Sequence, residues 1–194
     1  MKEIVYFVAS SLDGYIAGPK GDCSLFSKRG SITTRYRDEA ADFDTVIMCR
    51  QHYEACYGYG LQAGQPVFPG KAHYILSNSL TFSNAHPSMH VISPTPENVQ
   101  KLRSDSSTGI FLCGSGPFAG WLLENGLIDR LKVQINPIIQ GAGMTLFGSS
   151  TTSLSMDFVS STAGGGGVQL NEYRIHHGAK LQDEAYFSGD DLDV

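Results

Sequence analysis

A glycine-rich junction between an apolar run and a helical pattern is the strongest candidate for a binding site. The segment IFLCGSGPFAGWLL, residues 110–123, passes through Gly114-Ser115-Gly116 directly into the helical pattern. Glycines let a bound group approach the backbone closely, and the first N–H groups of a helix attract anions. The junction therefore indicates a phosphate site, and an ordinary strand-to-helix turn is the alternative interpretation.

Two other strand ends add polar side chains that suit a phosphorylated ligand. The apolar run DTVIMC, residues 44–49, is followed by Arg50, and the run YIL is followed by Ser77 and Asn78. Ligands of open α/β sheets bind outside the carboxyl ends of the strands, and a guanidinium group suits phosphate. A solvated arginine at a helix start, and polar residues that merely end a strand, are the alternatives.

The opening loop, VASSLDGYIAGPKGD, residues 8–22, holds apolar side chains between turn residues. Tyr15, Ile16 and Ala17 lie between Gly14 and Gly18, and glycine adopts backbone angles closed to other residues. A plain surface hairpin does not need this apolar segment, whereas a loop that closes over a flat ligand does need it.

Short apolar runs alternating with amphipathic stretches predict the elements that position these residues. Strands are predicted at 3–10, 44–49, 72–77, 89–93, 109–114 and 130–139. Helices are predicted over 95–105 and between Gly116 and Gly126, with further candidates at 31–43 and 50–57. The alternation favours an α/β domain with a mostly parallel sheet. Residues 156–177 predict an antiparallel hairpin around the glycine run 164–167.

Composition and charge narrow the class of protein. The 194 residues are 41% hydrophobic and 17% charged, with a formal net charge of -5, which predicts a globular chain without a nucleic-acid surface. Four cysteines without CxxC spacing predict reduced thiols. No apolar run reaches membrane-spanning length and no signal peptide is recognised, so we expect a cytoplasmic protein without a membrane partner.

In their order along the chain, these segments resemble a known family. VASSLDGYIAGPKGD, DTVIMCRQHYE, YILSNSL and FLCGSGPFAGWLLENGLIDRLKVQINPIIQGAGMTLF are similar to the C-terminal reductase domain of the riboflavin-biosynthesis bifunctional protein and its stand-alone homologues. The resemblance covers Val5 to about Tyr173. It implies an α/β, dihydrofolate reductase-like fold with a central mixed, mostly parallel sheet, helices on both faces and a C-terminal antiparallel hairpin. We expect one domain over residues 1–177 and an acidic tail over 178–194.

The resemblance implies that NADPH, or alternatively NADH, binds along the ends of these strands. Ala9 would present its backbone to the nicotinamide carboxamide, and Ile16 and Ala17 would cover the nicotinamide ring. The pyrophosphate site at the helix start would be formed by Cys113, Gly114, Ser115, Gly116 and Pro117.

The adenosine end of the cofactor would lie at the second and third strand ends. By resemblance, Arg50 would lie beside the adenosine phosphate, with Ser77 and Asn78 at the adenine and ribose. The chain departs from the family's Gly-Arg-x-Thr at Cys49 and His52. His52 would replace the threonine as a donor, especially when protonated.

Reduction of a C=N bond also needs a proton at the neighbouring atom. Asp13 is the predicted catalytic acid by resemblance, and a turn that shapes the loop is its alternative role. Asp22, Asp38 and Glu39 are further candidates. Phe118 stands where relatives often carry an acidic residue, which leaves the identity of the substrate open.

The resulting hypothesis is an NADPH-dependent reductase of a small heterocyclic substrate, of the pterin or ribosylamino-pyrimidine type, as in riboflavin biosynthesis. A nucleotide-binding protein of the same fold without turnover, and a reductase of an unrelated carbonyl or nitro compound, are the alternatives. A homodimer is expected by resemblance, and the long apolar strand 130–139 is predicted to lie at an uncovered sheet edge. No metal site is expected, because adjacent histidines such as His176 and His177 point to opposite faces of a strand.

Overall fold

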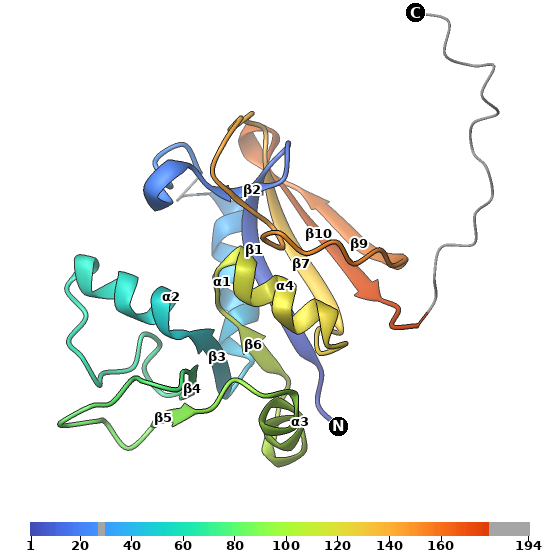
Figure 1. The fold of residues 1–194 in the computed structure, drawn as a ribbon. Helices are drawn as coiled ribbons and strands as arrows, with labels where there is room; N and C mark the ends of the chain where they lie inside the picture. Colours follow the sequence, from blue (N-terminus) through green and yellow to red (C-terminus); the bar gives the residue numbers. More distant parts are fainter. Residues whose placement is uncertain (27–29, 179–194) are drawn as a thin grey trace, which may run out of the picture.

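The computed structural model describes residues 1–26 and 30–178, and its main element is an eight-stranded sheet (Figure 1). The strand order is β5-β4-β3-β6-β1-β7-β10-β9. These strands are β1 (Ile4–Ser11), β3 (Thr45–Cys49), β4 (Ala72–Leu76), β5 (Met89–Ile92), β6 (Ile110–Leu112), β7 (Arg130–Asn136), β9 (Met156–Ala163) and β10 (Gln169–Ile175). The predicted tail lies outside the described residues except for Gly178.

Strand directions divide the sheet into two parts. All pairs from β5 through β7 are parallel, whereas β10 pairs antiparallel with both β7 and β9. The predicted α/β fold with a mostly parallel sheet and a C-terminal antiparallel hairpin is therefore confirmed. The glycine run forms the hairpin loop, with a short 3-10 turn at Gly165–Gly167.

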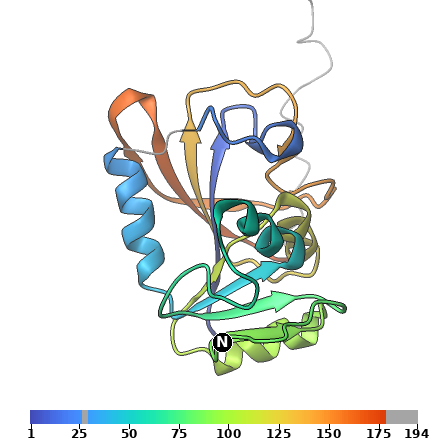
Figure 2. The same cartoon turned by 90° about the vertical axis from the view of Figure 1, so that its left-hand side faces the viewer.

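Helices cover both faces of the sheet. They are α1 (Ser31–Ala41), α2 (Arg50–Ala55), α3 (Pro96–Asp105) and α4 (Gly116–Glu124). In Figures 1 and 2, α1 lies on one face and α3 and α4 lie on the other. Alternation along β1 follows this arrangement, because Tyr6 belongs to the core cluster that includes Leu122 of α4, whereas Phe7 belongs to the core cluster of the opposite face.

The prediction that strand 130–139 lies at an uncovered edge was wrong. β7 lies between β1 and β10, and the actual edge strands are β5 and β9. Leu131 and Val133 of β7 are buried because they join the core cluster that includes residues of α3 and α4 on one face of the sheet. The prediction failed because alternating apolar and polar residues indicate that one face of a strand is buried, but they do not indicate which strands lie next to it.

The family-like segment ENGLIDRL has a structural role at the amino end of the sheet. Nη2 of Arg103, on α3, lies 2.8 Å from both carboxylate oxygens of Asp129. The same carboxylate accepts a hydrogen bond of 2.7 Å from the N–H of Ile4 in β1. Asp129 thus joins α3, β1 and the residue before β7 in one contact.

In the described part of the chain, no helix combines the length and the apolar character needed to cross a bilayer.

Candidate cofactor-binding site

The central strand β1 loses one of its two neighbours halfway along its length. β1 pairs with β6 over Ile4–Tyr6 only, whereas it pairs with β7 as far as Ser11. Beyond Tyr6, no described strand pairs with β1 on the side of β6. Ala9 lies in this part of β1 and is partly exposed. The place where β1 and β6 separate is therefore the candidate position for a ligand at this edge of the sheet.

The opening loop forms a second, small sheet. β2 (Tyr15–Ala17) pairs with β8 (Met144–Thr145) in antiparallel fashion, and this pairing joins the loop to a segment almost 130 residues further along the chain. Ala17 is 6% exposed, and a Cβ built on Gly143 would lie 2.0 Å from its carbonyl oxygen. Ile16 packs against the main core cluster. The predicted lid residues are therefore anchored, and the Ala17 side chain is enclosed by protein.

Asp13 connects the loops that follow β1 and β7, which lie side by side at the carboxyl end of the sheet (Figure 2). Its carboxylate accepts hydrogen bonds from the backbone N–H of Gln140 at 3.0 Å and of Gly141 at 2.8 Å. The hydrogen bond from Gln140 is the largest of the causes that lower the pKa of Asp13 to about 2. An ionised carboxylate in this position shapes the loops, which favours the structural interpretation over the role of catalytic acid.

Two of the other candidate acids, Asp22 and Glu39, also have local partners. Asp22 accepts hydrogen bonds from the N–H and hydroxyl of Ser24. Partial burial opposes ionisation of Glu39, but hydrogen bonds from Lys132 and Arg35 outweigh it and lower the pKa of Glu39. Asp38 is exposed on α1. Glu39 is thus held as a carboxylate, which makes it a poor proton donor at neutral pH.

The start of α4 packs tightly against β8. A Cβ built on Gly116 would lie 1.9 Å from the carbonyl oxygen of Thr145. The N–H of Gly116 donates to Sδ of Met144 over 3.4 Å. Glycine at position 116 is therefore required by this packing, whether or not a phosphate binds. The contact between Gly116 and Met144 could not be predicted from the sequence, because it joins segments far apart in the chain.

Arg50 lies at the carboxyl ends of β3 and β4, as predicted, within a polar cluster. Its Nε lies 2.8 Å from Oε1 of Glu54, and its Nη1 donates to Oγ of Ser79 over 2.7 Å. The Ser77 hydroxyl accepts hydrogen bonds from the N–H groups of Ser79 and Leu80, so it shapes this turn. Sequence reasoning missed Glu54 and Ser79, although the i,i+4 spacing of Arg50 and Glu54 is a recognisable signal.

His52 faces the interior of the site. Its Nε2 lies 3.5 Å from Sγ of Cys113, and burial lowers the pKa of His52. Burial likewise raises the pKa of Cys113 to about 12. A neutral imidazole beside a neutral thiol does not fit the predicted role of a protonated phosphate donor. On the other face of β3, Sγ of Cys49 lies 3.4 Å from Oγ of Ser115.

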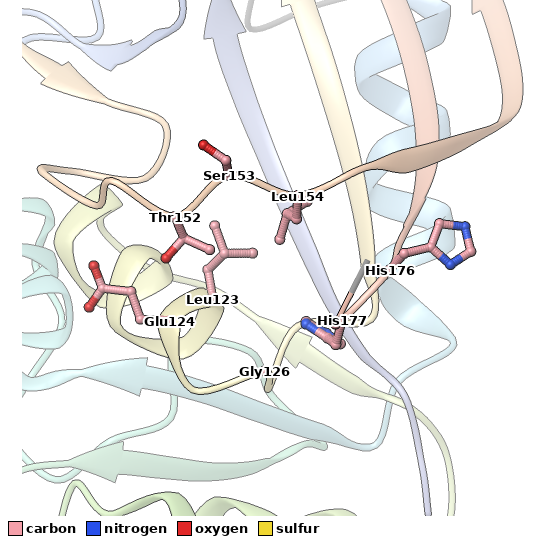
Figure 3. Close-up of a pocket in the computed structure, with 9 residues that line it drawn as sticks. Leu123, Glu124, Gly126, Thr152, Ser153, Leu154, His176 and His177 are labelled. Carbon is pink, nitrogen blue, oxygen red and sulfur yellow. The ribbon is translucent and has the colours of Figure 1, made fainter. Parts of the chain in front are cut away.

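A separate pocket of about 310 Å³ lies at the far end of α4 (Figure 3). It is lined by Leu123, Glu124, the segment 152–154 and His177, and it does not include the carboxyl ends of the parallel strands. His176 also lines it, and in Figure 3 the side chains of His176 and His177 point away from each other. His176 pairs with Asp157, and His177 bonds to the carbonyl oxygen of Ile128. In the described residues, no three His, Cys, Asp or Glu side chains converge to hold a metal ion.

Comparisons with known proteins agree with this architecture. The family model described as the RibD C-terminal domain matches residues 2–170, so the chain belongs to the RibD C-terminal domain family. Membership supports a reductase related to those of riboflavin biosynthesis. Among curated proteins, the uncharacterized protein YwjB of Bacillus subtilis (strain 168) is 24% identical over 177 residues, which cover 89% of this chain and 98% of YwjB.

Solved structures share the fold at low sequence identity. A protein of Shewanella sp. PV-4, assigned provisionally to riboflavin biosynthesis, superposes with a TM-score of 0.74 at 22% identity, covering 90% of this chain and 99% of the other. A pyrimidine reductase-like protein of Corynebacterium diphtheriae superposes with a TM-score of 0.67 at 14% identity, covering 91% and 92% of the two chains. Together with the sheet order, these likenesses establish a dihydrofolate reductase-like fold.

Proposed function

We propose that the protein is an NADPH-dependent reductase of a small heterocyclic substrate, of the pterin or ribosylamino-pyrimidine type. The separation of β1 from β6 after Tyr6 is the observation that carries the proposal. It leaves Ala9, the start of α4 and Arg50 along one edge of the sheet, in the order that a dinucleotide requires. Membership in the RibD C-terminal domain family supports the same activity.

The chain offers different groups to the two ends of the cofactor. The Ala9 backbone and Ile16 would contact the nicotinamide, and Arg50, Ser77 and Asn78 would contact the adenosine phosphate and ribose. The pyrophosphate would lie at the start of α4, beside Cys113, Gly114, Ser115, Gly116 and Pro117. A thioether is a weak acceptor, so a phosphate oxygen can replace Met144 at the Gly116 N–H.

The reduced nicotinamide supplies a hydride to the substrate when it is bound. The substrate must receive a proton at the atom beside the reduced carbon. Asp13 and Glu39 are both held as carboxylates by hydrogen bonds from their neighbours. In this proposal, solvent water delivers the proton and Asp13 orients the loops that border the substrate.

The first prediction concerns cofactor binding. NADPH at a hundred times its Kd is expected to stabilise the protein by about 2.7 kcal/mol, visible as a rise in melting temperature. Arg50→Ala is expected to raise the Kd for NADPH about tenfold or more, because it removes a charge-assisted contact with the 2′-phosphate. The Kd for NADH should change by less than about twofold, since NADH carries no 2′-phosphate.

Substrate turnover separates this proposal from its alternatives. Oxidation of NADPH, followed by its absorbance, is measured with pterin, pyrimidine, carbonyl and nitro substrates in turn. Binding without turnover of any compound would favour the nucleotide-binding alternative. No stabilisation by NADPH or NADH would contradict the proposal, and an equal effect of Arg50→Ala on both cofactors would remove the assigned role of Arg50.

A second prediction concerns assembly through β9. This strand, and not β7, lies at an edge of the sheet. β9 is eight residues long, and on the side away from β10 no described strand pairs with it. Its exposed side chains include Met156, Phe158 and Val159. Edge strands of this length and character pair readily with other chains. We propose a homodimer in which two copies of β9 pair about a two-fold axis.

Light scattering is expected to give about 42 kDa, twice the chain mass of 21.0 kDa. Phe158→Lys combined with Val159→Lys places charges on both faces of the edge and is expected to give a monomer. Tyr59→Lys is the matched control, because Tyr59 is highly exposed away from β9. A wild-type monomer at high concentration, or an unchanged dimer in the β9 variant, would contradict assembly through this edge.

A further inference from the structure

The polar cluster around Arg50 contains opposite charges in one small space. Arg50 and Glu54 are separated by one helical turn of α2, with Nε and Oε1 2.8 Å apart. Ser79, in the turn after β4, accepts a hydrogen bond from Nη1 of the same guanidinium. The side chains of Arg50 and Glu54 are 45% and 33% exposed. A ligand at this edge can therefore reach both charged groups.

The two charged groups of the cluster, Arg50 and Glu54, suit different substituents at the 2′ position of a ribose. A guanidinium has five N–H donors, and the contacts with Glu54 and Ser79 use Nε and Nη1, so Nη2 remains to bind a phosphate oxygen. A carboxylate repels phosphate, but it accepts a hydrogen bond from a ribose hydroxyl, as in sites that bind NAD. Arg50 thus favours a 2′-phosphate, and Glu54 favours a 2′-hydroxyl.

Neither α2 nor the turn after β4 carries a second permanent positive charge that could offset Glu54. The sequence of α2 is RQHYEA, in which Arg50 is the permanently charged cation. His52 faces Cys113, and burial lowers the pKa of His52, so it adds no charge at neutral pH. The turn after β4, residues 77–80, reads SNSL and is uncharged. Within these two described segments, Arg50 is thus the one permanent cation that would offset Glu54 beside a 2′-phosphate.

We infer that Glu54 is a specificity-determining residue that limits the preference for NADPH over NADH. The inference rests on the proposed function, because it concerns the adenosine end of the same site. Glu54 lowers the affinity for the 2′-phosphate both by direct repulsion and by holding Nε of Arg50. Ser79 is a positioning residue that fixes the guanidinium through Nη1. The wild-type protein consequently binds both cofactors with only a modest preference for NADPH.

The test is Glu54→Gln, which keeps the size of the side chain and a carbonyl acceptor for Nε of Arg50. The ratio of the Kd for NADH to the Kd for NADPH is expected to rise about tenfold at low salt, the effect of one charge roughly 6 Å from a phosphate at intermediate screening. The rise should shrink in 0.5 M salt because the interaction is electrostatic. Isothermal titration with each cofactor measures both constants directly.

Glu124→Gln provides the matched control. It removes the same charge at the opposite end of α4, beside the pocket of Figure 3, and is expected to leave the ratio within twofold of wild type. Ser79→Ala is expected to weaken NADPH two- to fivefold without improving NADH, because the guanidinium loses one of its two fixed contacts.

The outcomes distinguish this inference from the proposed function. If the wild-type protein binds neither cofactor, the proposed function fails. If both cofactors bind but Glu54→Gln leaves the ratio unchanged, or tightens NADH as much as NADPH, Glu54 is an ordinary partner of Arg50 on the helix surface and the inference fails. A rise in the ratio with an unchanged melting temperature supports it, since loss of a structural pair would act on stability.

Discussion

Asp129→Ala is expected to lower the free energy of unfolding by about 3–5 kcal/mol, a large effect for one side chain. The carboxylate accepts from Nη2 of Arg103 through both of its oxygens, and from the N–H of Ile4. The two side chains are 10% and 22% exposed, so removal of Asp129 leaves a guanidinium largely buried without its counter-charge. The substitution also removes the contact between α3 and the residue before β7, whereas the hydrogen bond from Nε of Arg103 to the carbonyl oxygen of Lys2 remains.

Urea unfolding at pH 7 measures this effect. Asp157→Ala is the control, because it removes a carboxylate that pairs with His176 while 68% exposed, and exposed pairs of this kind contribute about 0–1 kcal/mol. A loss of stability no larger for Asp129→Ala than for Asp157→Ala would show that the Arg103 pair is weak.

The second large effect is expected for Gly116→Ala at the start of α4. Alanine normally stabilises a helix by about 0.5–1 kcal/mol relative to glycine. Here the new methyl group would meet the carbonyl oxygen of Thr145 at 1.9 Å, which forces β8 away from the helix. We therefore expect a loss of about 1–3 kcal/mol in the free energy of unfolding. Because β8 also pairs with β2, NADPH affinity should fall as well.

Gly58→Ala is the control for this substitution. A Cβ at Gly58 would meet no atom within 4 Å, so alanine there should leave stability and cofactor binding close to wild type. Urea unfolding and titration with NADPH are measured on both variants. Gly116→Ala with wild-type stability would mean that α4 and β8 separate easily.

The sequence predicted local features well and long-range contacts poorly. The helix predicted over 95–105 is present as α3, and Thr95 caps it by accepting a hydrogen bond from the N–H of Asn98. The place of β7 in the sheet was missed, because the alternation of its side chains is compatible with either an edge or a central strand. β8 was missed because two residues carry no periodic signal.

The candidate site shows the same contrast. The positions of Arg50 and Gly116 at strand ends followed from apolar runs and turn residues. The partners of these two residues could not be predicted in this way, because the fold brings Ser79 to Arg50 and Met144 to Gly116. Asp13 illustrates the difficulty best: its hydrogen bonds join residues 127 and 128 positions away, and no local pattern distinguishes this role from that of a catalytic acid.

The short ladder between β1 and β6 also has a mechanical consequence. Within the described sheet, the ladder divides two halves, which consist of the strands β5-β4-β3-β6 and β1-β7-β10-β9. Three register pairs between β1 and β6 join these halves, whereas seven pairs join β1 to β7. The ladder is thus the shorter of the two strand contacts of β1, and core clusters pack across it on both faces: one includes Ile47 and Val133, and the other includes Val5 and Phe111. A ligand that extends from Arg50 to Ala9 would cross this ladder and would add a further contact between the two halves of the sheet.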